Sequence, residues 1–208
     1  MKFKSSYQAK LVDEKGFVHY TDQEHNIWQQ LYERQLKILP GRACDEHIHG
    51  LDLLGLTNDK IPQIPDINKR LKAITGWTVS PVEALISHKD FFSLLASKVF
   101  PVATFIRSQE ELNYVKEPDI FHEIFGHCPM LTQMDFANFA QKYAEKVLTM
   151  PTSDWALMQR LFWFTVEFGL IQTTDGIRAY GGGILSSIGE TTYSVDSNEP
   201  LRVLYEPM

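Results

Sequence analysis

The chain has 208 residues, a formal net charge of −6, and 44% hydrophobic and 22% charged residues, as is typical of one globular domain with its own core. Acidic and basic residues are mixed along the chain, so the basic stripe of a nucleic-acid-binding protein is missing. Its longest apolar runs are too short to span a bilayer, and residues 1–5 lack the apolar core of a signal peptide. Its two cysteines are too few for a disulfide framework and fit a reducing compartment. We therefore expect one cytoplasmic domain over 1–208 without nucleic-acid or membrane partners.

The first half of the chain predicts mainly helices. Residues 1–20 show no regular pattern and are expected to form a loose N-terminal arm. Thr21 and Glu24 have the spacing of a capping box, and they precede apolar residues at helical intervals that run to Leu39. Further helices are expected over 45–54, 66–74 and 88–98.

The second half predicts two longer helices and a few short strands. The helices are expected over 136–149 and 153–168, the latter stopped by Gly169. Strands are expected where β-branched or aromatic residues lie between turn signals, over 100–106, 177–180 and 193–195. The predicted fold class is therefore mainly α with a few short β-strands.

The most informative segment contains His122 and His127. Five residues turn an ideal α-helix by about 500°, so the two imidazoles would point roughly 140° apart and could not chelate one ion. Gly126 can end the helix and Pro129 prevents its continuation, so we expect His127 to swing back toward His122 from the first residue outside the helix. The spacing alone leaves two unrelated histidines at a helix end as an equal alternative.

Glu167 is a third candidate ligand because it lies in an otherwise apolar helix. A carboxylate there carries a desolvation cost on the order of several kcal/mol unless it is paired or binds a cation. Two histidines and one carboxylate form the facial triad of non-haem Fe(II) oxygenases, which leaves coordination positions open. A buried ion pair with an arginine remains the alternative for Glu167.

Several segments, in the same order, resemble the pterin-dependent aromatic amino acid hydroxylases, in particular their single-domain bacterial phenylalanine 4-hydroxylases. The resemblance covers about residues 20–195. It is carried by LPGRAC (39–44), TGW (75–77), FIR (105–107), EPDIFHEIFGHCP (117–129), WFTVEFGL (163–170) and AYGGGILSS (179–187). It implies one catalytic domain that hydroxylates an aromatic amino acid, with L-phenylalanine to L-tyrosine foremost. It further implies O2, Fe(2+) and tetrahydrobiopterin or a related tetrahydropterin, in a monomer or dimer.

The resemblance also implies roles for individual residues. The iron ligands are His122, His127 and Glu167. The carboxylate of the amino acid is held by Arg107, supported by Ser186 and with Glu190 nearby. The residues expected to line the substrate ring are Pro118, Trp163, Phe168 and Gly183. The residues expected to contact the pterin are Ile86, Phe91 and Glu123.

Some features depart from the family pattern. Val115 and Lys116 differ from the animal enzymes, so contacts at the amino end of the substrate are not implied. The chain also ends sooner after Tyr193 than family members usually do, which bears on closure of the pocket.

Other readings stay open at this stage. The substrate could be tyrosine or tryptophan. A zinc hydrolase is an alternative because His122-Glu123 begins like H-E-x-x-H, although the second histidine comes one residue late. A non-catalytic protein that has kept the fold is another. The 181–183 glycine run lacks the Lys-Ser/Thr of a P-loop and fits close backbone approach to a substrate better.

Overall fold

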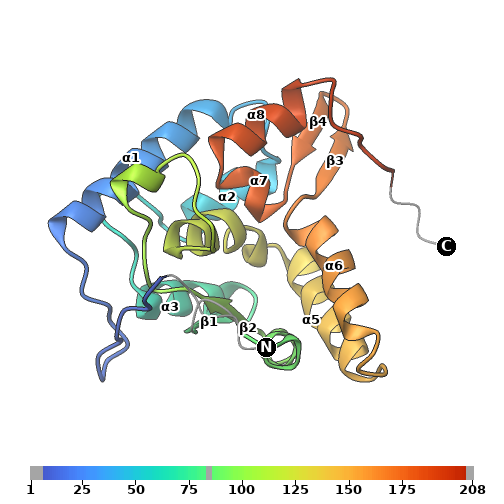
Figure 1. The fold of residues 1–208 in the computed structure, drawn as a ribbon, viewed down its shortest axis with the longest axis horizontal. Helices are drawn as coiled ribbons and strands as arrows, with labels where there is room; N and C mark the ends of the chain where they lie inside the picture. Colours follow the sequence, from blue (N-terminus) through green and yellow to red (C-terminus); the bar gives the residue numbers. More distant parts are fainter. Residues whose placement is uncertain (1–6, 83–85, 205–208) are drawn as a thin grey trace.

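A computed structural model describes residues 7–82 and 86–204 of the chain, and helices dominate it (Figure 1). The described elements are, in chain order, α1 (Asp22–Ile38), α2 (Asp45–Leu53), α3 (Ile64–Ile74), β1 (Thr78–Pro81), α4 (His88–Ala96), β2 (Val99–Val102), η1 (Gln109–Glu111), η2 (His122–His127), η3 (Met130–Thr132), α5 (Met134–Leu148), α6 (Trp155–Val166), β3 (Leu170–Thr173), β4 (Gly176–Ala179), α7 (Gly182–Leu185) and α8 (Ile188–Asp196). The predicted class, mainly α with short strands, is confirmed.

Helix α1 begins where its sequence predicts and packs on the centre of the molecule. The Thr21 side chain accepts the backbone N–H of Glu24, and the Glu24 carboxylate accepts the backbone N–H of Thr21, as in a capping box. The buried face of α1 contacts the segment that carries the histidines, because Trp28 lies edge-on to Phe121 with ring centroids 5.3 Å apart. This aromatic packing fixes the position of η2 relative to α1.

The N-terminal segment is irregular, as expected, but residues 7–20 are not loose. The backbone N–H of Lys10 donates to Thr104 Oγ1, and that hydroxyl donates to the Lys10 carbonyl. The ring of Tyr7 stacks on Phe105 with centroids 4.6 Å apart. Contacts of this kind leave no periodic pattern in a sequence, so the expectation of a loose arm is wrong for these residues. Residues 1–6 lie outside the described part of the chain.

The strands form two small sheets of two strands each. Strands β1 and β2 pair in parallel, and β3 pairs with β4 in antiparallel register. Neither β1 nor β3 was predicted, and the strand expected over 100–106 is shorter, since β2 ends at Val102.

The strand expected over 193–195 is wrong, because these residues end helix α8. Ser187 caps that helix by accepting the backbone N–H of Glu190. An N-cap with a good partner outweighs the weak β preference of three residues.

The segment with the histidines lies at the middle of the molecule, between α1 and α2 on one side and the α3–β1–β2 region on the other (Figure 1). Phe121, Ile124, Phe125 and Cys128 of this segment are almost completely buried. Helix α7 packs directly on it, since a side chain at Gly126 would meet the carbonyl oxygen of Gly182 at 2.6 Å. None of the helices described here is long and apolar enough to cross a membrane.

Candidate functional site

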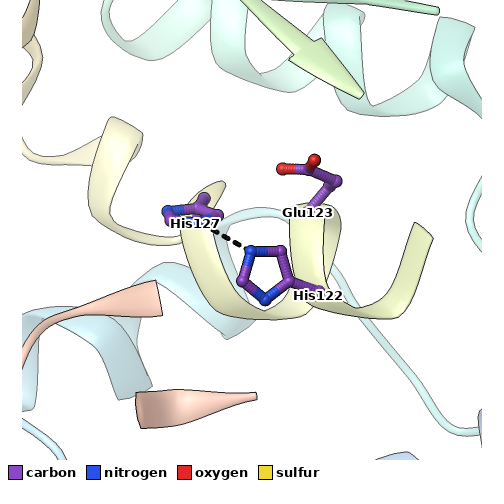
Figure 2. A group of neighbouring side chains, drawn as sticks. All are labelled: His122, Glu123 and His127. Atoms are coloured by element: carbon purple, nitrogen blue, oxygen red, sulfur yellow. Dashed lines mark hydrogen bonds between the residues drawn. The ribbon is translucent and has the colours of Figure 1, made fainter. Parts of the chain in front are cut away.

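His122 and His127 begin and end a π-helix, η2. Its hydrogen bonds link residues five apart, as between the N–H of Cys128 and the carbonyl of Glu123, so residues at this spacing lie over one another. The two imidazoles therefore face each other, with their Nε2 atoms 3.0 Å apart (Figure 2). The expected break at Gly126 is wrong, because the helix continues through Gly126. Its π-helical winding brings the two histidines together instead.

Glu167 completes this group from a different element. It is the C-terminal cap of α6, and its carboxylate places Oε2 2.9 Å from Nε2 of His127 and Oε1 3.5 Å from Nε2 of His122. Neighbouring ligands of an octahedral ion bonded at about 2.1 Å are about 3 Å apart. The two Nε2 atoms, and each of them with one carboxylate oxygen of Glu167, thus lie about as far apart as neighbouring ligands on one face of an octahedral metal site.

Glu123 is a rival carboxylate, since its ligand atom lies within 4.8 Å of those of His122 and His127. The Glu123 side chain projects from the helix in a different direction from the rings of His122 and His127 (Figure 2). Burial, together with the charges of Glu167 and Asp119, raises the pKa of Glu123 well above its usual value. Because metals bind the ionised form of a carboxyl group, Glu167, whose pKa is lowered, is the better third ligand.

The charge state of the other groups suits a cation. Burial would raise the pKa of Glu167, but His122 and His127 outweigh it and bring that pKa to about 2. Burial lowers the pKa of His122 to about 4, so this imidazole is neutral at neutral pH. Neutral imidazoles and an ionised carboxylate are the forms that bind metals.

Ser186 and Asp119 hold His122 in place. The Ser186 hydroxyl lies 3.0 Å from His122 Nδ1, and Asp119 Oδ1 accepts the backbone N–H of His122. If Nε2 faces a metal, Nδ1 carries the proton and donates it to Ser186, a common arrangement for metal-bound histidines. Ser186 was expected at the carboxylate end of the substrate, and the structure places it against a candidate ligand.

The glycine run 181–183 lets the backbone approach the candidate ligands. A side chain at Gly183 would come within 2.4 Å of Glu167 Oε1, and one at Gly182 within 2.4 Å of the His127 ring. The sequence interpretation placed a substrate at these glycines, whereas the described contacts are to His127 and Glu167. Gly183 therefore lies beside the candidate metal site because it is next to the Glu167 carboxylate.

A cavity of about 140 Å³, which we call the metal-side cavity, opens beside the three ligands. Five residues expected to contact pterin or substrate line it, namely Ile86, Phe91, Glu123, Pro118 and Trp163. Two others lie apart from it. The side chain of Phe168 is 46% exposed, and Glu190 is exposed on the first turn of α8.

Arg107 lines a second cavity of about 240 Å³, together with Ser186. We call it the arginine cavity. Arg107 forms no ion pair with Glu110 or Glu111, which lie three and four residues further along the chain. Its Nε and one terminal nitrogen instead contact the two carboxylate oxygens of Asp119 at 2.7 and 2.9 Å.

No role was predicted for Asp119, although it lies inside the 117–129 segment. Its side chain is completely buried, and Arg107 holds the pKa of Asp119 below its usual value even though burial alone would raise it. The only signal was an aspartate three residues before His122, a spacing that suggests a helix start rather than an ion pair. In the structure, Asp119 both accepts the backbone N–H of His122 at the helix start and forms the ion pair with Arg107.

Comparisons with known proteins agree with this geometry. The sequence model of the biopterin-dependent aromatic amino acid hydroxylases matches residues 3–208. The phenylalanine-4-hydroxylase of Pseudomonas aeruginosa is 52% identical over 204 residues, which are 98% of this chain and 78% of that protein. The structure of phenylalanine hydroxylase from Legionella pneumophila superposes with a TM-score of 0.93 at 63% identity, over 96% of this chain and 79% of that one.

A Chromobacterium violaceum phenylalanine hydroxylase solved with bound oxidised Fe(III) has a TM-score of 0.85 at 43% identity, over 88% of this chain and 66% of that one. The family model covers nearly the whole sequence, and its match agrees with the similarity in fold. The chain therefore belongs to the family of biopterin-dependent aromatic amino acid hydroxylases.

Proposed function

We propose that this chain hydroxylates L-phenylalanine to L-tyrosine with O2, and that His122, His127 and Glu167 hold the Fe(II) on which the reaction depends. The observation that supports this most directly is that the Nε2 atoms of His122 and His127 lie 3.0 Å apart and 3.5 and 2.9 Å, respectively, from the two carboxylate oxygens of Glu167. When bound, iron and a reduced tetrahydropterin supply the electrons with which dioxygen is activated. The protein's own part is to bind, orient and shield the reactants.

The metal-side cavity suits two flat ring systems. Phe91 and Trp163 line it from α4 and α6, and Pro118 adds an apolar wall. Aromatic faces favour stacked or edge contacts with rings, so we assign the pterin to Phe91, Ile86 and Glu123. We assign the substrate ring to Pro118 and Trp163. The surroundings of Glu123 raise its pKa, and in its protonated form this carboxyl can donate a hydrogen bond to a pterin acceptor.

The amino acid end of the substrate is assigned to Arg107. The two-point contact with Asp119 orients the guanidinium, and its second terminal nitrogen has no acceptor among the described residues. That nitrogen is free to donate to a carboxylate. Gly183 acts through its contact with Glu167. Phe168 and Glu190 stay predictions that rest on the family resemblance.

We further propose that residues 1–208 form one catalytic domain that acts in the cytoplasm as a monomer or dimer, with a small-molecule partner only. The described residues share one hydrophobic core that runs from α1 to α7, which supports a single domain. Cys44 and Cys128 are both free and buried, which is compatible with a reducing compartment.

One assay tests metal, pterin and substrate together. The protein is loaded with Fe(II), and tyrosine formation from L-phenylalanine is followed with tetrahydropterin and air, and again with each reactant omitted. We expect tyrosine only when all are present, with lower turnover of tyrosine and tryptophan as substrates. Tight zinc binding without any pterin-dependent oxidation would favour the hydrolase instead.

A further inference from the structure

The arginine cavity lies between α1, the segment that follows η1 and the start of α8. Its lining includes two arginines, Arg34 and Arg107, and the polar residues Gln35, Asn113, Ser186 and Ser187. No carboxylate lines it among the residues that the structure describes. Two arginines line this cavity, and no acid lines it among the described residues, so the cavity is suited to an anion.

The two arginines differ in how their charges are compensated. Arg107 is 5% exposed and forms its ion pair with Asp119 behind the cavity wall. Arg34 donates from one terminal nitrogen to Asn113 Oδ1 at 2.6 Å. Within residues 7–82 and 86–204 it has no ion-pair partner. Arg34 therefore brings an uncompensated positive charge to the cavity.

The start of α8 adds backbone donors to the same wall. This nine-residue helix is capped by Ser187, whose hydroxyl accepts the N–H of Glu190. The preceding residues Ile188 and Gly189 line the cavity, and their N–H groups belong to the first turn, which intrahelical hydrogen bonds leave unpaired. The N-terminus of α8, where the positive end of the helix dipole lies, thus lines the same cavity as Arg34 and Arg107.

We infer that Arg34 is a further ligand in the arginine cavity, where it contributes with Arg107 to binding a carboxylate or another small oxyanion. Leu31, Leu112 and Ile188 give the cavity an apolar side, which favours a carboxylate on a small organic molecule. The inference rests on the proposed function in one respect, since the substrate would supply such a carboxylate. Ser186 lines this cavity and contacts His122, so an occupant lies one residue from a candidate metal ligand.

The first test uses Arg34→Gln, which keeps hydrogen-bonding capacity and removes the charge. Lys37→Gln is the matched control, because Lys37 is exposed on the same helix and does not line the cavity. We expect Arg34→Gln to raise the KM for L-phenylalanine at least about fivefold, with iron content unchanged. With phenethylamine, which lacks the carboxylate, Arg34→Gln and wild type should differ little.

The second test uses inorganic phosphate as the probe and the thermal midpoint of unfolding as the readout, because a ligand of the folded state raises this midpoint. Phosphate should stabilise wild type and Lys37→Gln more than Arg34→Gln. A phosphate effect lost in Arg34→Gln with an unchanged KM would identify a free oxyanion as the occupant. If the wild type does not turn over phenylalanine, the proposed function fails and the phosphate test still decides. An Arg34→Gln variant that equals wild type in both tests would overturn the inference.

Discussion

The guanidinium of Arg107 lies in two-point contact with the carboxylate of Asp119, and both side chains are almost completely buried. Asp119 also accepts the backbone N–H groups of Arg107 and of His122. One carboxylate thus connects the proposed substrate clamp with the backbone of a proposed iron ligand. A change in either partner should therefore reach both ends of the site.

Replacing Arg107 tests its role as the clamp. Arg107→Ala should lower kcat/KM for phenylalanine about 30-fold to several thousand-fold, since loss of one partner of a buried charge pair costs about 2 to 5 kcal/mol. Arg107→Lys should rescue little, because one ammonium cannot make the planar two-point contact. Steady-state kinetics with iron analysis measure both. A change below about threefold in a folded protein would place the carboxylate elsewhere.

Asp119→Asn tests how much the ion pair with Arg107 contributes to the stability of the fold. It keeps the shape of the side chain but leaves the buried Arg107 without a charged partner, so the free energy of unfolding should fall by about 3 kcal/mol or more. Urea unfolding of Asp119→Asn and Arg107→Ala, measured alongside the kinetics, distinguishes a loss of stability from a loss of substrate binding.

The candidate iron ligands can be tested both indirectly, through a neighbouring glycine, and by replacing each of them. Gly183→Ala would place a methyl group 2.4 Å from Glu167 Oε1, so the carboxylate must move. We expect weaker Fe(II) binding with the fold retained, and a loss of iron affinity of an order of magnitude or more in His122→Ala, His127→Ala and Glu167→Ala. Iron is measured after equilibrium dialysis.

Gly189→Ala is the matched control for this change, because nothing lies within 4 Å of the added methyl group. It should bind iron as wild type does. Normal iron affinity and activity in Glu167→Ala would remove Glu167 from the ligand set.

The sequence predicted that His122 and His127 act together, but not how. Its argument used the period of an α-helix, which puts residues five apart on different sides. The winding of η2 depends on contacts from far along the chain, such as Trp28 on Phe121 and Gly182 on Gly126. The local sequence pattern contains no information on these contacts. It therefore predicted a broken helix, which is how an α-helical period could bring the two histidines together.

Long-range pairing explains the other misses. The ion pair of Arg107 with Asp119 joins residues 12 apart that no helical or strand period relates. The capping box at Thr21 and Glu24 was predicted correctly because all of its atoms lie within one turn. Phe168 and Glu190 were placed by resemblance alone, and both side chains are exposed in the described structure.

Replacing Phe91 tests whether this residue contacts the cofactor or only packs in the core. Its ring lies edge-on to Phe92 and Phe162, with centroids 5.4 and 5.8 Å apart, and the residue also lines the metal-side cavity. Phe91→Ala should raise the KM for tetrahydropterin and leave iron content near normal. Phe92→Ala provides the contrast, because Phe92 is completely buried and should mainly lose stability, by about 3 to 5 kcal/mol. Iron loss in Phe91→Ala without a change in the pterin KM would make it a core residue.

From the burial of His47 we predict how the free energy of unfolding depends on pH. It lies on α2, is completely buried, and neither ring nitrogen has a hydrogen-bond partner among the described residues. Burial, with a smaller contribution from the charge of His127, lowers the pKa of His47 to about 3. An unfolded histidine titrates near about 6.5. The folded state therefore favours the neutral ring, and the unfolded state binds more protons between these two values.

The sign of the effect follows from proton linkage. Above about pH 6.5, His47 is neutral in both states and does not lower the free energy of unfolding. As the pH falls from there toward about 3, the free energy of unfolding decreases, because the unfolded chain binds a proton at His47 and the folded chain does not. His47→Leu should change the free energy of unfolding little at pH 7.5, since no hydrogen bond to a described residue is removed. It should lose less stability than wild type between pH 7.5 and 5. His19→Leu is the control, because the side chain of His19 is 88% exposed. His122, whose pKa is also lowered, leaves a residual slope in all three proteins. Urea unfolding at both pH values measures the difference, and equal slopes in wild type and His47→Leu would show that this ring does not govern acid stability.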